Sequence, residues 1–305
     1  MTGGTGRGGT LLRLRAADWF GLKRLAAVLL STCVPVGILR SLPPSVRQRL
    51  PVPADLTEYV MYSGERVLLV APGRDQVAKS IFWGGGRPLS PNDRQVLFTF
   101  ERLVSDVDVF VDCGAYSGLF ALVAAKANPQ VRALAFELLP ENARLASSNV
   151  GANGLCARVE VFQMALSDSS GDILVPTDCG TVSHPSGLSL DSRFTTGRRV
   201  PIATIDSLGL GGKLMIKLDV EGFELNVMRG GIETIEALRP DMICEFLEGT
   251  GTDGPATALL KELGYMFYEI TGRGLVEREE IVADPNSRDW LLTARARPDI
   301  EAHLA

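Results

Sequence analysis

Five carboxylates hold the positions from which this chain could do chemistry, because each stands at or just past the end of a stretch with β-strand composition. They are Asp112, Glu137, Asp168, Asp219 and Glu245. In open parallel sheets, ligands bind beyond the carboxyl ends of the strands, near the switch in strand order. A row of acids at that edge would suit a ligand that carries positive charge and hydroxyl groups.

A glycine-containing turn follows the first of these acids. The apolar run Val109-Phe110-Val111 ends on Asp112, and a small-residue helix begins a few residues later. Glycine allows a tight turn and a close approach of a ligand to the backbone, and a helix N-terminus offers free N–H groups. The turn therefore predicts a site for a nucleotide-like cofactor. The residues expected to contact it are Asp112, Gly114, Ala115, Tyr116, Ser117 and Gly118.

Two further positions fit the same cofactor. Glu137 ends the second strand, and a carboxylate there can accept hydrogen bonds from both hydroxyls of a ribose. Leu166 and Ser167 follow the third strand and could flank an adenine, although a simple turn explains them almost as well. Asp112 could orient the glycine turn, contact an amino group through solvent, or only stabilise the helix N-terminus by its charge.

A charged strand supplies the candidate general bases. Lys217, Asp219 and Glu221 alternate, so they share one face if the strand extends that far. Buried charges need partners, and an ion pair of Lys217 with an acid is expected, in either a structural or a catalytic role. Asp219 or Glu221 is the preferred base, followed by Glu245 and by the loop residue His184.

A second glycine motif competes with the first. The run from Gly249 to Gly254 follows a strand and precedes a helix, and Glu269 ends the next strand, which meets the local criteria for a dinucleotide site. Its position argues against it, because too little chain follows Glu269 to complete a dinucleotide half-sheet. A nicotinamide-dependent oxidoreductase therefore remains an alternative function.

The elements that must position these residues alternate regularly. This order predicts an α/β fold with a mostly parallel sheet and helices on both faces. The expected strands are 107–112, 132–136, 159–162, 213–219, 241–246, 265–269 and one near 290–293. The expected helices are 116–127, 140–153, 223–237 and 255–263, with another after Pro91 and β-rich segments in 57–82.

The N-terminal region differs from the rest in charge. The 305-residue chain has a net charge of −5, yet residues 1–50 contain eight Lys or Arg and a single acid. The segment 11–40 is basic and apolar, and its uncharged run 25–39 is short for a spanning helix, which needs about 20 residues. A helical cap, a contact with a membrane surface and a targeting segment all stay open. We expect an extension over 1–53, a lead-in cap over 54–104, a main domain over 105–296 and a tail over 297–305.

The overall composition excludes some classes of partner and site. A mildly acidic chain gives no support to a nucleic-acid partner. Its five cysteines are scattered and lack Cys-x-x-Cys pairing, so neither a disulfide framework nor a zinc site is expected. Reduced thiols favour a cytoplasmic location, with membrane association through 11–40 as an addition.

Taken together, these segments resemble the FkbM-type family of S-adenosylmethionine-dependent methyltransferases over roughly residues 90–270. The specific part is a Lys-x-Asp-x-Glu-Gly run, from Lys217 to Gly222, after an Asp-x-Gly-x-x-x-Gly motif, from Asp112 to Gly118. Further matching segments are Ala135-Phe136-Glu137, Ala165-Leu166-Ser167-Asp168, Ser186-Gly187-Leu188-Ser189-Leu190 and Met242-Ile243-Cys244-Glu245.

The resemblance implies a seven-stranded class I methyltransferase fold, S-adenosyl-L-methionine as methyl donor, and methylation of hydroxyls on natural products or sugars. No metal is expected, since the sequence lacks a His/Asp arrangement that would hold one. The acceptor would be a small molecule, a sugar or a lipid-linked compound, with the pocket shaped by 57–90 and 176–198. The chain departs from the family at Tyr116, where asparagine is usual. A non-catalytic membrane-peripheral protein with the same fold is therefore a third hypothesis.

Overall fold

The computed structural model describes residues 28–29, 33–175, 197–285 and 288–304. The chain divides into two compact units, Met1–Pro53 and Ala54–Ala305. In the first unit the described residues form two short helices, α2 (Val36–Leu39) and α3 (Pro44–Arg47), each of which starts directly after a proline.

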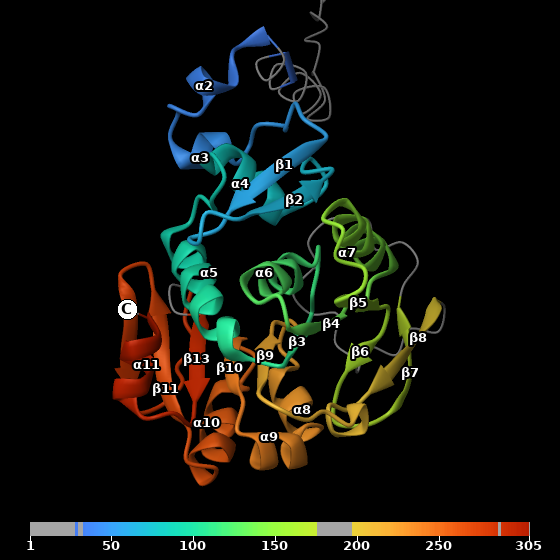
Figure 1. Ribbon diagram of the computed structural model, residues 1–305, viewed down its shortest axis with the longest axis vertical. Coiled ribbons are helices and arrows are strands. Elements are labelled where there is room, and N and C mark those ends of the chain that lie inside the picture. Colours follow the sequence, from blue (N-terminus) through green and yellow to red (C-terminus); the bar gives the residue numbers. More distant parts are fainter. Residues whose placement is uncertain (1–27, 30–32, 176–196, 286–287, 305) are drawn as a thin grey trace, which may run out of the picture. The chain divides into compact units, whose positions relative to one another are not determined.

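A mixed sheet with the strand order β12-β11-β13-β10-β9-β3-β4-β5 forms the centre of the second unit (Figure 1). Five neighbouring strands run parallel: β3 (Val109–Cys113), β4 (Arg132–Phe136), β5 (Val159–Phe162), β9 (Leu214–Leu218) and β10 (Asp241–Glu245). Three strands complete it: β13 (Asp289–Thr293), which is antiparallel to both of its neighbours, β11 (Met266–Thr271) and the edge strand β12 (Gly274–Arg278). The strand order reverses between β3 and β9, so a ligand is expected at that point.

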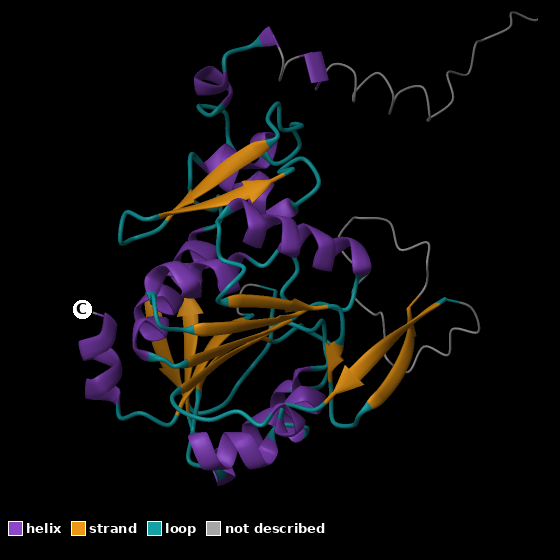
Figure 2. Cartoon of the chain, turned by 45° about the vertical axis from the view of Figure 1, so that its right-hand side comes forward, coloured by secondary structure: helices purple, strands orange, loops and turns teal. Residues whose placement is uncertain are grey.

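Helices cover both faces of the sheet because the parallel strands are apolar on both sides (Figure 2). One face carries α5 (Pro91–Leu103), α6 (Leu119–Ala127) and α7 (Pro140–Ala152). The other carries α8 (Glu224–Arg229), α9 (Ile232–Leu238) and α10 (Asp253–Glu262). Helix α5 is joined to the sheet through Phe100, whose ring centroid lies 4.8 Å from that of Phe110 on β3.

The lead-in segment forms a hairpin and a helix. Strands β1 (Leu56–Val60) and β2 (Arg66–Val70) pair in an antiparallel ribbon, and α4 (Gln76–Gly84) follows. Helix α7 binds the edge of β2, since Asn153 exchanges two hydrogen bonds with the backbone of Leu68, at 2.9 and 2.8 Å.

The remaining elements are small. A three-stranded sheet has the order β6-β8-β7, with β6 (Ala165–Leu166), β7 (Gly171–Val175) and β8 (Arg198–Ala203). Two 3₁₀ turns span Val104–Asp106 and Asp206–Leu208, and α11 (Arg297–Leu304) ends the chain with Ile300 buried.

The α/β class and the expected parallel strands are confirmed, but five details differ from the sequence interpretation. The sheet has an eighth strand, β12, which no pattern indicated. Helix α4 was not expected within the β-rich lead-in, the tail contains α11, and α6 begins at Leu119 instead of residue 116.

The fifth difference is a break in the helix expected over 223–237. The chain turns at Gly230, where an added Cβ would stand 1.9 Å from the carbonyl oxygen of Ser167. A continuous helix with side chains at this point would collide with the loop after β6. The element therefore divides into α8 and α9.

Candidate active site

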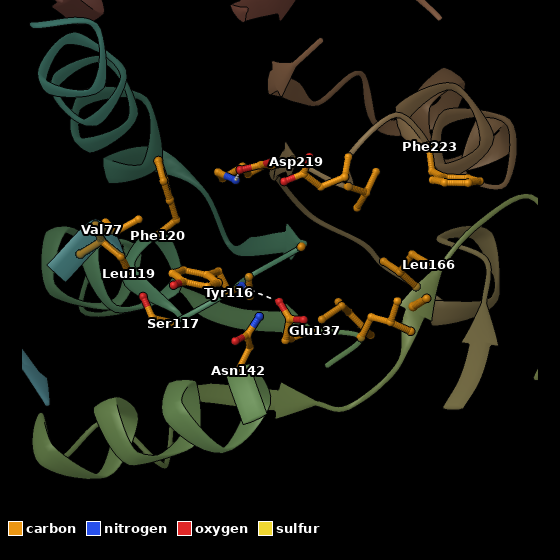
Figure 3. A pocket seen from close by; sticks show the side chains of 18 of the residues that line it. Val77, Tyr116, Ser117, Leu119, Phe120, Glu137, Asn142, Leu166, Asp219 and Phe223 are labelled. Carbon is orange, nitrogen blue, oxygen red and sulfur yellow. Dashed lines mark hydrogen bonds and ion pairs between the residues drawn. The ribbon is translucent and has the colours of Figure 1, made fainter. Parts of the chain in front are cut away.

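A pocket of about 310 Å³ lies where the strand order reverses, at the carboxyl ends of β3, β4 and β9 (Figure 3). Its walls come from the β3–α6 turn, the end of β4, the β5–β6 segment and the turn after β9. The first two residues of α4 complete it. The volume falls at the lower end of the range for small-molecule sites.

The floor of the pocket is a backbone contact that only glycine permits. Gly114 has φ +79°, and a Cβ added there would lie 1.8 Å from the carbonyl oxygen of Asp219. The amide of Asp219 in turn donates to Cys113 O at 3.0 Å. Close apposition of the turns after β3 and β9 thus depends on residue 114 having no side chain.

Glu137 is a carboxylate held by backbone donors with one side open to the pocket. Its Oε2 accepts from Tyr116 N at 2.8 Å, the contact drawn as a dashed line in Figure 3, and its Oε1 accepts from Leu139 N at 2.7 Å. Burial raises the pKa of Glu137 to about 7 despite these donors. Each oxygen keeps a second lone pair, which suits a ligand with two neighbouring hydroxyls.

A buried lysine and two acids stand beside the glycine turn. Lys217 Nζ lies 2.9 Å from Asp219 Oδ2 and 4.8 Å from the centroid of the Phe120 ring. In the register of β3 and β9, Asp112 is the partner of Lys217. Burial lowers the pKa of Lys217, but the charges of Asp219 and Asp112 outweigh it, so the lysine stays protonated.

The pKa values of Asp112 and Asp219 shift in opposite directions. Burial raises the pKa of Asp112 to about 6, since Lys217 only partly offsets it. Burial would also raise the pKa of Asp219, but Lys217 and a hydrogen bond with Glu245 lower it. Asp219 therefore remains an ionised acceptor at the pocket wall.

Glu245 stands behind Asp219, on the neighbouring strand. Its Oε1 lies 2.9 Å from Arg288 Nη2, and its carboxyl group is hydrogen-bonded to Asp219. Burial and the negative charge of Asp219 raise the pKa of Glu245 to about 10. Of the two carboxyl groups, Glu245 is therefore the one that binds a proton more readily.

The turn after β9 presents Glu221 at the mouth of the pocket. Glu221 adopts φ +55°, a conformation that is costly for a residue with a side chain and that often marks functional sites. The turn is held from within by Glu224, whose Oε1 accepts from Val220 N at 3.2 Å and Gly222 N at 3.0 Å. Partial burial and the charge of Asp219 raise the pKa of Glu221.

These buried acids predict how stability depends on pH. The folded-state pKa values of Glu137, Glu224 and Asp289 rise to about 7, through burial, from ordinary values of 4.5, 4.5 and 3.8. A raised acid pKa means that the folded state binds the proton more tightly, so stability is lost as pH rises toward the folded pKa. We expect the melting temperature of the ligand-free protein to fall between pH 5 and pH 7.5, roughly that window.

The variant Glu224→Gln tests this expectation, because its amide oxygen can still accept from the turn. It should flatten the pH dependence and raise stability near pH 8 by on the order of 1–3 kcal/mol. Glu233→Gln, on the surface of α9, serves as the control. A wild-type melting temperature that rises over this window would contradict the assignment.

Most of the site residues expected from the sequence meet in this pocket. Its lining includes Gly114, Ala115, Tyr116, Ser117, Glu137, Leu166, Asp219 and Glu221. Four others do not line it, and their contact with a ligand stays a prediction: Asp112, Gly118, Ser167 and Glu245. Asp112 and Ser167 are buried, Gly118 packs against Ala146, and Glu245 lies behind Asp219. His184 lies outside the described residues.

Sequence reasoning missed several lining residues. Asn142, Met164 and Phe223 come after expected strands, but no motif or spacing in the sequence singles them out. Gln76 and Val77 were missed because α4 itself was not recognised, although Asp75 is a typical N-cap residue and could have indicated it.

The competing glycine run 249–254 does not line the pocket. Glu269, which the dinucleotide interpretation needs for a ribose, is instead paired with Arg278, with Oε2 2.6 Å from Nη2. Within the described ranges, no three His, Cys, Asp or Glu side chains are grouped to hold a metal ion. Nor does any helix in that part of the chain combine the length and apolar character that crossing a bilayer requires.

The amino-acid sequence of this chain is similar to those of known methyltransferases. A family model described as "Methyltransferase FkbM domain" matches residues 112–267. The methyltransferase sdnD of Sordaria araneosa is 29% identical over 187 residues, which cover 51% of this chain and 72% of that protein.

Two solved structures are similar at low identity. The methyltransferase FkbM from Methylobacillus flagellatus has a TM-score of 0.44 at 16% identity, covering 72% of this chain. This chain spans 55% of that protein's length. The precorrin-6y C5,15-methyltransferase of Geobacter metallireducens has a TM-score of 0.38 at 12% identity, covering 66% of this chain and 87% of its own.

Proposed function

This chain belongs to the FkbM methyltransferase family, and from that premise we propose that it is an S-adenosyl-L-methionine-dependent O-methyltransferase. The proposed acceptor is a hydroxyl group of a small molecule, sugar or natural product. Methyl transfer follows from the family. The cofactor and the hydroxyl acceptor rest on the arguments below.

One observation carries the cofactor assignment: a backbone-anchored carboxylate faces the pocket beside a glycine turn. Glu137 has free acceptor capacity for a ribose diol, and its orientation is set by Tyr116 N and Leu139 N. Leu166 and Phe223 provide apolar surface for an adenine at the same end of the pocket (Figure 3). The residues present therefore fit S-adenosylmethionine.

When bound, this cofactor supplies an electrophilic methyl group on a sulfonium sulfur. Transfer to a hydroxyl forms an O–CH₃ bond and breaks the S–CH₃ bond. The hydroxyl releases its proton, which a base must accept. Glu221 is placed to accept that proton, since it lies at the mouth and its pKa is raised. Asp219 is the poorer base, because Lys217 holds its carboxylate at 2.9 Å.

The charges of the lining support a neutral acceptor. Glu137, Asp219 and Glu221 outnumber Lys217, whose charge is already balanced by Asp219. A phosphate or carboxylate on the acceptor would meet uncompensated negative charge. Apolar side chains such as Leu119 and Phe120 provide surface for a ring or chain that bears the hydroxyl.

Calorimetric titration with S-adenosylhomocysteine and with NAD tests the cofactor. We expect S-adenosylhomocysteine to bind and Glu137→Gln to weaken it by about 10–100-fold, the value of a lost charge-assisted hydrogen bond. The control is Glu160→Gln, which removes only the surface pair with Arg132. Binding of NAD alone would overturn the proposal in favour of an oxidoreductase, and binding of neither would favour a non-catalytic protein.

Mass spectrometry of small molecules from cells with and without the protein would identify the acceptor. A compound that gains one CH₂ unit of mass only when the protein is present is the expected product. Sensitivity of that product to base hydrolysis separates an ether, which resists, from a methyl ester. An ester product would contradict the hydroxyl acceptor.

For partners and location we keep two proposals from the sequence: a cytoplasmic protein, and peripheral membrane contact through residues 11–40. Basic residues beside apolar ones support the second proposal by attraction to anionic lipid. Sedimentation of the full chain with phosphatidylglycerol vesicles should be reduced when Lys23 and Arg24 are changed to glutamate. Equal binding to neutral phosphatidylcholine vesicles would count against it.

A further inference from the structure

Tyr116 lies in the glycine turn after β3, and its backbone amide and its hydroxyl contact different partners. The backbone has φ +50°, a conformation that asparagine tolerates better than tyrosine. Its amide donates to Glu137, while its hydroxyl accepts a hydrogen bond from Gln76 N at 3.2 Å. The side chain thus connects the turn between β3 and α6 (residues 114–118, the cofactor turn) with the first residue of α4.

A second contact joins the same two segments. Asp75 caps α4, with Oδ1 accepting from Val77 N at 2.8 Å and Ala78 N at 3.0 Å, and it is only 1% exposed. Burial raises the pKa of Asp75, and the nearby Ser117 side chain partly offsets this increase. Consecutive residues of the cofactor turn therefore lie beside consecutive residues at the start of α4.

A third contact reaches the hairpin that precedes α4. Asn149 of α7 is fully buried; its Nδ2 donates to Ser117 O at 2.8 Å, and its Oδ1 accepts from Val70 N at 2.7 Å. One amide side chain thus bridges the cofactor turn and β2. The lead-in segment is attached to the turn at both ends of the loop between β2 and α4.

The start of α4 lies at one particular end of the pocket. Val77 is grouped with Leu119 and Phe120, on the side of Tyr116 away from Leu166 and Phe223 (Figure 3). Phe120 contacts Lys217, and Lys217 pairs with Asp219. This end therefore adjoins Asp219, two residues before the proposed base Glu221, and the opposite end holds the proposed adenine. Val77 is still 37% exposed, as expected of a residue at an open mouth.

We propose that the first turn of α4 is the acceptor-side wall of the pocket, with Gln76 and Val77 as specificity-determining residues. Tyr116 is the positioning residue that attaches this wall to the cofactor turn, and Asn149 attaches the same turn to β2. Naming this end the acceptor side rests on the proposed function; the attachment itself does not. Because the wall and the cofactor share Tyr116, filling the cofactor end should stabilise α4.

Hydrogen–deuterium exchange of the full chain tests the attachment. Tyr116→Phe is compared with Tyr62→Phe, a control that removes a hydroxyl donating to Arg94 O, away from the pocket. Without ligand, amides of 76–84 should exchange about fivefold faster in Tyr116→Phe than in wild type, from the loss of one hydrogen bond. Saturating S-adenosylhomocysteine should slow these amides in wild type and in Tyr62→Phe.

The same ligand should protect residues 113–122 in every variant, but α4 only when the hydroxyl is present. A merely structural role would instead change exchange throughout the unit. Equal exchange of 76–84 in wild type and Tyr116→Phe would overturn the attachment. If S-adenosylhomocysteine protects nothing in wild type, the proposed function fails, while the ligand-free comparison still decides the attachment.

The specificity assignment has its own test. Val77→Asp should leave the affinity for S-adenosylhomocysteine within about twofold, because Val77 is placed at the acceptor end, and should lower the yield of methylated product at least about tenfold. Val276→Asp is the matched control, since Val276 is 36% exposed on β12 and does not line the pocket. Loss of S-adenosylhomocysteine binding in Val77→Asp, or unchanged product yield, would overturn the assignment.

Discussion

Gly114→Ala is expected to abolish cofactor binding, with the dissociation constant for S-adenosylhomocysteine rising by at least about a hundredfold. The added Cβ would stand 1.8 Å from Asp219 O and 2.8 Å from Asp219 C, which are backbone atoms of the neighbouring turn. Moving these atoms would cost free energy, because the Asp219 amide donates a hydrogen bond to Cys113 O. The positive φ adds a further cost of about 1–2 kcal/mol for alanine.

The variant should also lose stability, since the turns after β3 and β9 must separate. Gly151→Ala is the matched control: it lies in nearby α7, and an added Cβ there meets nothing within 4 Å. That substitution should keep full binding and stabilise the helix by roughly 0.5–1 kcal/mol. Calorimetry and thermal melting measure both effects. Binding of Gly114→Ala within about threefold of wild type would show that the turn opens more easily than its contacts indicate.

Glu221→Gln is expected to lower methyl transfer by about 10²–10⁴-fold while S-adenosylhomocysteine still binds normally. The carboxylate lies at the mouth of the pocket and takes no part in the contacts that hold Glu137 or the glycine turn. Its raised pKa gives the rate a pH dependence: transfer should increase with pH as Glu221 loses its proton. The readout is the amount of methylated product formed from a small-molecule extract.

Asp219→Asn should have a different signature. Lys217 would lose the negative charge of its partner at 2.9 Å, and only one of the two Asp219 oxygens that now serve Lys217 and Glu245 would remain as an acceptor. Both stability and cofactor affinity should therefore decline together with turnover. Glu248→Gln, an exposed acid in the loop after β10, is the control for either substitution. If Glu221→Gln and Asp219→Asn both kept full turnover, the base would have to be sought elsewhere.

The sequence by itself was sufficient for the class of fold and for the edge of the sheet that carries the site. Strands such as 109–113 and 214–218 are apolar on both faces, and this composition is typical of a parallel sheet covered by helices. Acids at the ends of these strands must meet at one edge, because the carboxyl ends of parallel strands coincide. Glu137 and Asp219 were found in this way, and Glu221 was found from its alternation with Lys217 and Asp219; all three line the pocket.

Only the tertiary structure decided which side chains line the pocket. Asp112 and Glu245 end strands as Glu137 does, yet one is buried within the sheet and the other lies behind Asp219. The end of a strand can be read from composition over a few residues. The direction of the final side chain depends on the register with the neighbouring strands and on the helix packed above it.

The need for glycine at 114 and the role of tyrosine at 116 have the same origin. Gly114 meets the backbone of Asp219, and Tyr116 meets Gln76, contacts between segments far apart in the chain. Spacing along the sequence indicates a turn at 112–118, but the atoms that press against that turn are supplied by β9 and α4. The sequence predicted the turn at which the cofactor is proposed to bind, and the packing of distant segments determined which residues line the pocket there.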